Sequence, residues 1–129
     1  MTKPRPVVAV VDDDPRLLES LEDLLESAGY VTRSFSSAAS LLVNGLSGVD
    51  VLITDIGMPG MDGFELRDRV KKAHPDLPIF LITGRHEMAD RHRAQGINGF
   101  FRKPFDAKAL LAAVGDALRN REMEGNHDT

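Results

Sequence analysis

Short apolar runs alternate with helical patterns along the whole chain. The runs cover residues 7–11, 30–35, 49–54, 77–82 and 97–102. Runs that stay apolar, rather than alternating with polar residues, are typical of strands buried on both faces of a parallel sheet. Patterns with helical spacing or helix caps follow them, at residues 15–28, 37–43, 63–73, 87–95 and 107–121. The chain is therefore predicted to be an α/β protein, a single (βα)5 unit with a doubly wound parallel sheet.

Turn and capping residues mark the ends of the expected helices. Asp14-Pro15 supplies an N-cap followed by proline at the first helical position, Gly29 ends the same helix, and Asp62 can cap the helix expected at 63–73. The residues beyond Arg121 are mostly polar and include a glycine. We therefore expect one domain over residues 1–121, followed by a polar tail, 122–129, that is disordered or a linker stub.

Polar residues stand at the carboxyl ends of the expected strands. They are Asp12, Asp13, Asp55, Thr83 and Lys103. In open parallel sheets, the crevice beyond the carboxyl ends of the strands is the place where ligands bind. Burying a carboxylate just past a buried strand costs free energy unless a partner group compensates its charge. The pattern therefore predicts one shared acidic pocket.

The residue types in this pocket favour phosphate chemistry. Three carboxylates without a nearby histidine or cysteine suit a hard divalent cation, and Mg²⁺ leaves room for phosphate oxygens. Lys103 would add a positive charge and Thr83 a hydroxyl donor, which together suit a phosphate group. A carboxylate can also attack phosphorus and become an aspartyl phosphate.

Composition excludes several other classes of function. The chain has 129 residues, enough for one domain with a core. Its net charge of −4, from 16 basic and 20 acidic residues, argues against direct nucleic-acid binding. The absence of cysteine excludes disulfides and thiolate catalysis. No apolar run approaches the roughly 20 residues of a membrane helix or resembles a signal peptide, so we expect a cytoplasmic protein without membrane association.

Four motifs occur in order along the chain and carry a family resemblance. They are VVDDD (10–14), TDIGMPGMDG (54–63), Thr83-Gly84 and FFRKPF (100–105). With these motifs the sequence resembles response-regulator receiver domains, the phospho-accepting modules of two-component signalling, from Pro6 to Arg119. The resemblance implies a flavodoxin-like fold with strand order 2-1-3-4-5.

The resemblance implies a role for each residue of the pocket. Asp55 would be the phosphoacceptor, and Lys103 would contact the phosphoryl group. Asp12, Asp13, Asp55 and the backbone carbonyl of Gly57 would hold Mg²⁺, for which Mn²⁺ could substitute. The Lys103–Pro104 peptide bond would be cis.

The resemblance also implies a switch and its partners. Thr83 would move toward the phosphoryl group, and the aromatic ring of Phe100 would turn inward. The donor would be a histidine kinase or a phosphotransfer protein. The output would be a changed surface formed by the helix at 87–95, the strand at 97–102 and the last helix, which would regulate a partner protein, a homodimer or an output domain.

Several alternatives stay open at this point. Asp14 is interpreted only as a helix cap, and Phe100 could simply pack in the core. A phosphatase or phosphotransferase with an aspartyl nucleophile, as in haloacid-dehalogenase-type enzymes, is a rival. Such enzymes place a second acid two residues after the nucleophile, where this chain has Gly57. We therefore expect a regulatory domain rather than an enzyme.

A receiver that signals without phosphate is a further alternative. A receiver joined to a DNA-binding domain is another, although the chain ends before one could fit.

Overall fold

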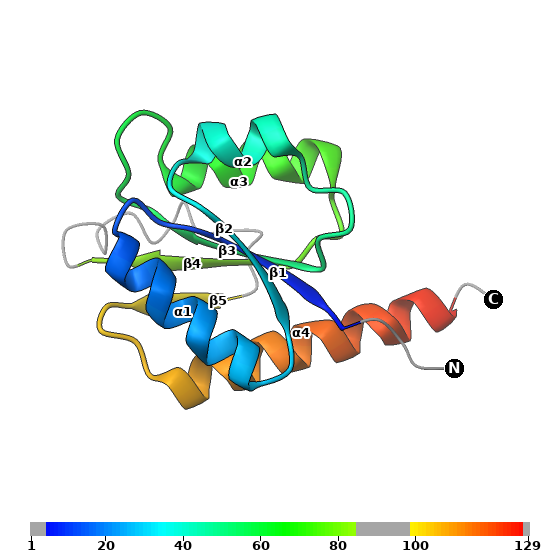
Figure 1. The fold of residues 1–129 in the computed structure, drawn as a ribbon. Coiled ribbons are helices and arrows are strands. Elements are labelled where there is room, and N and C mark those ends of the chain that lie inside the picture. Colours follow the sequence, from blue (N-terminus) through cyan, green and yellow to red (C-terminus); the bar gives the residue numbers. More distant parts are fainter. Residues whose placement is uncertain (1–4, 85–98, 128–129) are drawn as a thin grey trace.

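A parallel five-stranded sheet forms the centre of the protein in the computed structural model, which describes residues 5–84 and 99–127, with side chains up to Arg121 (Figure 1). The strands are β1 (Val7–Val11), β2 (Val31–Phe35), β3 (Val51–Asp55), β4 (Ile79–Thr83) and β5 (Gly99–Arg102). Their order is β2-β1-β3-β4-β5, and every pairing is parallel. The predicted fold class and strand order are confirmed. The helix expected at 87–95 lies outside the described residues.

Helices cover both faces of the sheet. The described helices are α1 (Pro15–Ser27), α2 (Ala38–Asn44), α3 (Gly63–Ala73) and α4 (Ala107–His127). α2 and α3 lie on one face, and α1 and α4 lie on the other (Figure 1). Side chains alternate along each strand, so β1 contributes Ala9 and Val11 to the core beneath α2 and α3, and Val8 and Val10 to the core beneath α1 and α4. Both faces of the central strands are therefore buried, which explains their continuous apolar runs.

The expected caps are present and set where the helices begin. The Asp14 side chain accepts a hydrogen bond from the Arg16 backbone N–H at 2.9 Å, with Pro15 in the first turn. The Asp62 side chain accepts one from the Glu65 N–H, also at 2.9 Å. The loops that follow β1 and β3 lie at the same edge of the sheet because the two strands are parallel neighbours.

The last helix is longer than the sequence pattern indicates. α4 continues to His127, so residues 122–127 of the expected disordered tail belong to this helix. Glu and Met, which follow Arg121, are good helix formers, and a single internal glycine such as Gly125 costs only about 1 kcal/mol. Polarity alone is therefore a poor guide to where this helix ends.

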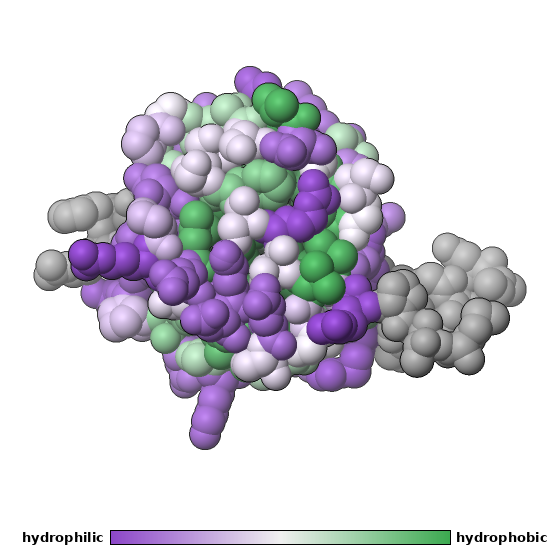
Figure 2. Space-filling view, viewed as in Figure 1, coloured by the Kyte–Doolittle hydropathy of each residue, from purple (hydrophilic) through white to green (hydrophobic). Residues whose placement is uncertain are grey.

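The surface shows no large apolar face in the view of Figure 2, where hydrophilic side chains surround scattered apolar patches. Val43 on α2 is the most exposed large apolar residue among those described, with 87% of its surface accessible. Within the described residues, no helix combines the length and apolar character needed to cross a bilayer.

Candidate functional site

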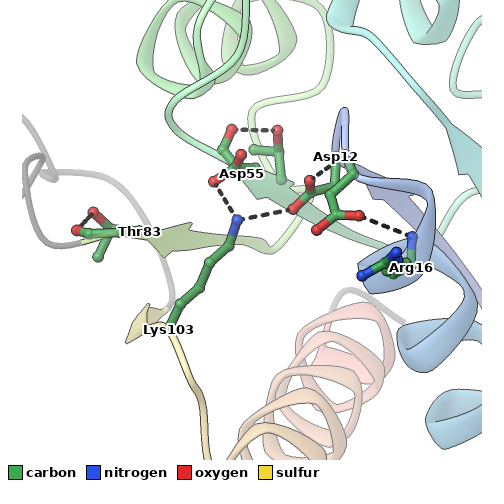
Figure 3. Close-up of polar contacts among 8 residues, drawn as sticks. Asp12, Arg16, Asp55, Thr83 and Lys103 are labelled. Carbon is green, nitrogen blue, oxygen red and sulfur yellow. Dashed lines mark hydrogen bonds and ion pairs between the residues drawn. The ribbon is translucent and has the colours of Figure 1, made fainter.

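The topology brings the acidic residues to one edge of the sheet. Asp12 follows β1, Asp55 is the last residue of β3, and these strands are neighbours in parallel register. Lys103 follows β5, which pairs with β4 on the other side of β3. The three side chains point toward one another at the carboxyl ends of their strands (Figure 3). The predicted gathering of these side chains is therefore present in the structure.

Lys103 lies between two buried carboxylates. Its Nζ is 3.3 Å from Oδ2 of Asp12 and 3.3 Å from Oδ1 of Asp55. The two carboxylate side chains are only 1% and 5% exposed, whereas the lysine side chain is 32% exposed. The Lys103 backbone N–H donates to the carbonyl oxygen of Thr83 at 2.8 Å, which anchors the start of this loop to β4. The Lys103–Pro104 bond is cis, as the resemblance implies.

The two oxygens of Asp12 have different surroundings. Oδ1 accepts a hydrogen bond from the Asp14 backbone N–H at 2.8 Å. Oδ2 is fully buried and accepts no hydrogen bond from any described residue, although Lys103 is close enough for an ion pair. The contact of the ammonium with this oxygen is an ion pair of 3.3 Å. Asp12 therefore presents one buried oxygen that could take a further cation.

The pKa values of these groups indicate a deficit of positive charge. Burial raises the pKa of Asp12 above its usual value, and the nearby Asp55 raises it further, despite the Asp14 N–H and Lys103. Burial by itself would lower the pKa of Lys103, but the attraction of Asp55 and Asp12 outweighs it and raises the pKa. One ammonium thus serves two buried carboxylates and leaves negative charge uncompensated.

The carboxylates are also placed to bind a metal ion. One oxygen from each of Asp12, Asp13 and Asp55 lies within 4.8 Å of the others, and Asp13 is exposed at the rim. An all-oxygen, multiply charged set of this kind suits Mg²⁺ or a similar hard cation. Together with the buried Oδ2 of Asp12, this donor set fits the metal that the sequence predicts. The carbonyl of Gly57 belongs to an exposed residue two positions after Asp55.

Thr83 lies at the same edge of the sheet, but its hydroxyl donates to a neighbouring backbone carbonyl rather than to Asp55 or Lys103. The residue is fully buried at the end of β4. Its Oγ1 donates to the carbonyl oxygen of Gly84 at 2.8 Å, to one side of Asp55 and Lys103 in Figure 3. The hydroxyl would therefore have to exchange this acceptor to reach a group on Asp55.

The two aromatic residues of β5 point to opposite faces of the sheet. Phe100 is half-buried against the core under α2 and α3. Phe101 packs on the α1 and α4 side, with its ring centroid 6.1 Å from that of Phe80. Phe100 thus occupies a partly exposed packing position.

Two residues that shape the site were not singled out from the sequence. The Thr54 hydroxyl is buried and lies 3.0 Å from the carbonyl oxygen of Asp55, to which it donates. Gly63 packs so closely that an added Cβ would lie 2.5 Å from the same carbonyl oxygen. A glycine directly after the Asp62 cap could have signalled this close approach, because glycine is not favoured inside helices. Both residues define the backbone that carries Asp55.

We expect Asp12→Asn to increase the free energy of unfolding of the metal-free protein at neutral pH. A carboxyl whose pKa is raised by folding binds its proton more tightly in the folded state, so its contribution to stability falls as pH rises through that pKa. Asparagine keeps an oxygen for the Asp14 N–H without the buried charge. Urea unfolding in EDTA would measure the free energy of unfolding of both proteins. The advantage of Asp12→Asn should disappear at pH values below about 4, the usual pKa of aspartate. A less stable variant at neutral pH would contradict the charge deficit.

Comparison with known proteins places these features in a family. The family model described as "Response regulator receiver domain" matches residues 8–115 of the chain. The C4-dicarboxylate transport transcriptional regulatory protein DctD of Rhizobium meliloti is 38% identical over 122 residues, which cover 92% of this chain and 26% of that protein. The heme response regulator HssR of Staphylococcus epidermidis is 35% identical, over 92% of this chain and 54% of that protein. The chain thus spans about a quarter to a half of the length of these curated relatives.

Solved structures share the whole fold. The response regulator StyR matches with a TM-score of 0.84 and 33% identity, over 97% of this chain and 65% of that chain. A receiver domain of an HD domain-containing protein from Pseudomonas fluorescens matches with a TM-score of 0.87 and 28% identity, over 98% of this chain and 96% of that chain. The similarity therefore covers the sheet and all the helices described above.

Proposed function

The chain belongs to the response regulator receiver domain family, and we propose that it is a switch that accepts a phosphoryl group on Asp55. The observation that carries the proposal is the position of this carboxylate. It is 4% exposed, contacts the Lys103 ammonium and lies in the three-carboxylate cluster with Asp12 and Asp13. A buried carboxylate with both a cation and a metal site beside it is equipped to receive a phosphoryl group. Asp12 shares this environment, and the family motif at residues 54–63 is what favours Asp55 as the acceptor.

In the proposed reaction, an oxygen of Asp55 attacks the phosphorus of a phosphohistidine. The new O–P bond forms as the P–N bond breaks, and the imidazole nitrogen keeps the electron pair and takes a proton. Lys103 is held beside Asp55 and can neutralise charge on the phosphoryl oxygens. The donor is a histidine kinase or a phosphotransfer protein.

Mg²⁺, or Mn²⁺ in its place, would be held by Asp12, Asp13, Asp55 and the carbonyl of Gly57. When bound, the ion neutralises negative charge on the transferring phosphoryl group. The support in this chain is the all-oxygen cluster and the buried oxygen of Asp12.

The proposed switch begins with the added charge. A phosphoryl group brings roughly two negative charges to Asp55. Thr83 would exchange the carbonyl of Gly84 for this new acceptor, and Phe100 would turn inward from its half-buried position. The charge would thereby favour one of two conformers already in equilibrium. The changed surface would include the segment 87–95, β5 and α4.

The output of the switch is proposed from the relatives. DctD is named a transcriptional regulatory protein and HssR a heme response regulator. The present chain would act in the same way through an output domain, a partner protein or phosphorylation-dependent self-association, and would not itself bind nucleic acid. As a regulatory domain, it would carry out only its own phosphorylation and dephosphorylation. Gly57, at the position of the second acid of haloacid-dehalogenase-type enzymes, supports this view over an enzyme.

Incubation with acetyl phosphate tests the proposal directly. This small donor needs no kinase, since the P–O bond breaks and acetate leaves. Intact-mass measurement should show one added phosphoryl group, formed with Mg²⁺ and not with EDTA. Mapping of the adduct by borohydride reduction and peptide sequencing should place it on Asp55. An adduct on another residue, or none with Mg²⁺, would contradict the proposal.

A further inference from the structure

A polar contact ties the end of α4 to the sheet, at the edge opposite to the acidic pocket. The guanidinium of Arg121 donates through Nη1 to the backbone carbonyl of Asp50 at 2.9 Å, and the same nitrogen lies 3.9 Å from Oδ1 of the Asp50 carboxylate. Asp50 directly precedes β3, whose other end is Asp55. The contact therefore joins two residues that are 71 positions apart in the chain and that the proposed phosphoryl chemistry does not use.

Asp50 is itself held in place by the first strand. Its Oδ2 accepts a hydrogen bond from the Val7 backbone N–H, and its own N–H donates to the Val7 carbonyl, both at 2.8 Å. Val7 begins β1, which pairs with β2 on one side and β3 on the other. β1 begins and α4 ends on the same side of the molecule (Figure 1). Arg121 is thus anchored to a point that the centre of the sheet supports.

The apolar packing of α4 ends about one turn before this contact. The buried apolar side chains of the helix are Leu110, Val114 and Ala117. Leu118 is the last described residue that packs partly against the same core, and Arg119 and Asn120 are exposed. Among the side chains described beyond Leu118, Arg121 is the one that donates a hydrogen bond to a residue of the sheet edge. The last turns of α4 are therefore held by a polar contact rather than by burial.

The helical stretch that follows Arg121 is too short to be stable by itself. α4 continues to His127 and includes Gly125, which has a low helix propensity. Isolated helices shorter than roughly 12–15 residues are marginal in water, because the first turn costs more conformational entropy than its hydrogen bond returns. The stretch persists as a helix because the turn before it is already fixed. Arg121 is the residue that fixes this turn.

We propose that the contact of Arg121 with Asp50 is a latch for the end of α4. When it is closed, it fixes the last turns on the start of β3 and keeps the helix continuous to His127. When it is open, these turns leave the sheet, while the strands and the buried part of α4 stay in place. The side chains of Arg121 and Asp50 are 38% and 41% exposed, so water can replace either partner. Opening therefore requires less free energy than global unfolding.

Amide hydrogen exchange of the whole chain, followed residue by residue by NMR, tests the latch. Arg121→Met removes the donor and keeps a long side chain. It should accelerate exchange about 10-fold at the amides of residues 119–127, as expected for the loss of one hydrogen bond from a charged group. Arg121→Lys should accelerate exchange less, because its ammonium can still donate to the Asp50 carbonyl. The amides of Val7 and Asp50, which bond to each other's residue, should be unchanged and serve as an internal reference.

Arg119→Met is the matched control. It makes the same substitution two residues earlier in α4, where the described partner of the guanidinium is Asp116 of the same helix. Both side chains of that pair are exposed, and an exposed ion pair contributes little to stability. The control should therefore change exchange at residues 119–127 by less than about 2-fold.

Three outcomes would overturn the latch. Exchange in Arg121→Met equal to that of wild type would show that the contact does not hold the end of the helix. Equal acceleration in Arg119→Met would show that the effect comes from the charge of the helix rather than from its contact with Asp50. Equal acceleration at Val7 and Asp50 would show that the whole edge of the sheet loosens instead of the helix end alone.

Discussion

Asp55→Asn should abolish the phosphoryl adduct formed with acetyl phosphate and Mg²⁺, whereas wild type should carry one group. An amide oxygen is a far weaker nucleophile than a carboxylate, and Asp55 is the proposed acceptor at the end of β3. Asparagine has nearly the same size and keeps an oxygen toward the ammonium. The loss of the adduct should therefore occur in a folded protein. Intact mass and thermal unfolding of the same sample would establish both points.

Asp14→Asn is the matched control for this experiment. It makes the same chemical change, with the same loss of charge, close to the acidic cluster. Asp14 is exposed and caps α1 through the Arg16 N–H, a task that asparagine performs equally well. The control should retain the full adduct and its dependence on Mg²⁺. Undiminished phosphorylation of Asp55→Asn would show that Asp55 is not the acceptor. Loss of the adduct in both variants would show that the lost charge, rather than the identity of Asp55, is responsible.

Gly63→Ala should destabilise the protein by about 3 kcal/mol, although it adds a single methyl group. The new Cβ would lie 2.5 Å from the carbonyl oxygen of Asp55 and 2.8 Å from the Cα of Ile56. Both neighbours are backbone atoms at the end of a central strand, so they cannot move aside as a flexible side chain would. Gly63 also donates its N–H to the Ile56 carbonyl at 2.9 Å, which holds α3 against this turn. Urea unfolding would measure the loss, a large share of a typical domain's stability.

Gly115→Ala makes the same substitution where the structure has room. The added Cβ would lie 3.5 Å from the nearest atom, in the exposed side chain of Arg119 within α4. Relief of glycine's low helix propensity should then increase stability by roughly 0.5–1 kcal/mol. Equal effects of the two substitutions would refute the close approach of α3 to the end of β3. A loss of phosphorylation in folded Gly63→Ala would show that this approach also positions Asp55.

The pattern of the sequence was sufficient for the architecture because its signals are local and repeat along the chain. Continuous apolar runs predicted strands buried on both faces, and the caps at Asp14 and Asp62 predicted where two helices begin. The same signals failed at the end of α4, where the residues after Arg121 are mostly polar but include good helix formers. Helix propensity and burial are separate properties, and a hydrophobic pattern reports only the second.

The residues of the site were predictable in identity but not in their contacts. Placement at the ends of parallel strands was enough to bring Asp12, Asp55 and Lys103 to one edge, since all parallel strands end on the same side. Family motifs supplied their proposed roles. The close packing of Gly63 against the carbonyl of Asp55 depends on segments that only the folded chain brings together. The acceptor of the Thr83 hydroxyl is the carbonyl of the adjacent Gly84, and the sequence does not specify the side-chain rotamer that selects it.

The sequence by itself determined the fold class, the strand order through the family resemblance, and the set of polar residues at the edge of the sheet. The tertiary structure alone decided how these charges are shared. It gives Asp12 one oxygen bonded to the backbone and one buried oxygen facing Lys103, and so it leaves one ammonium between two carboxylates. Distances between segments far apart in the chain set these interactions, because electrostatic energy depends on separation and burial rather than on residue type.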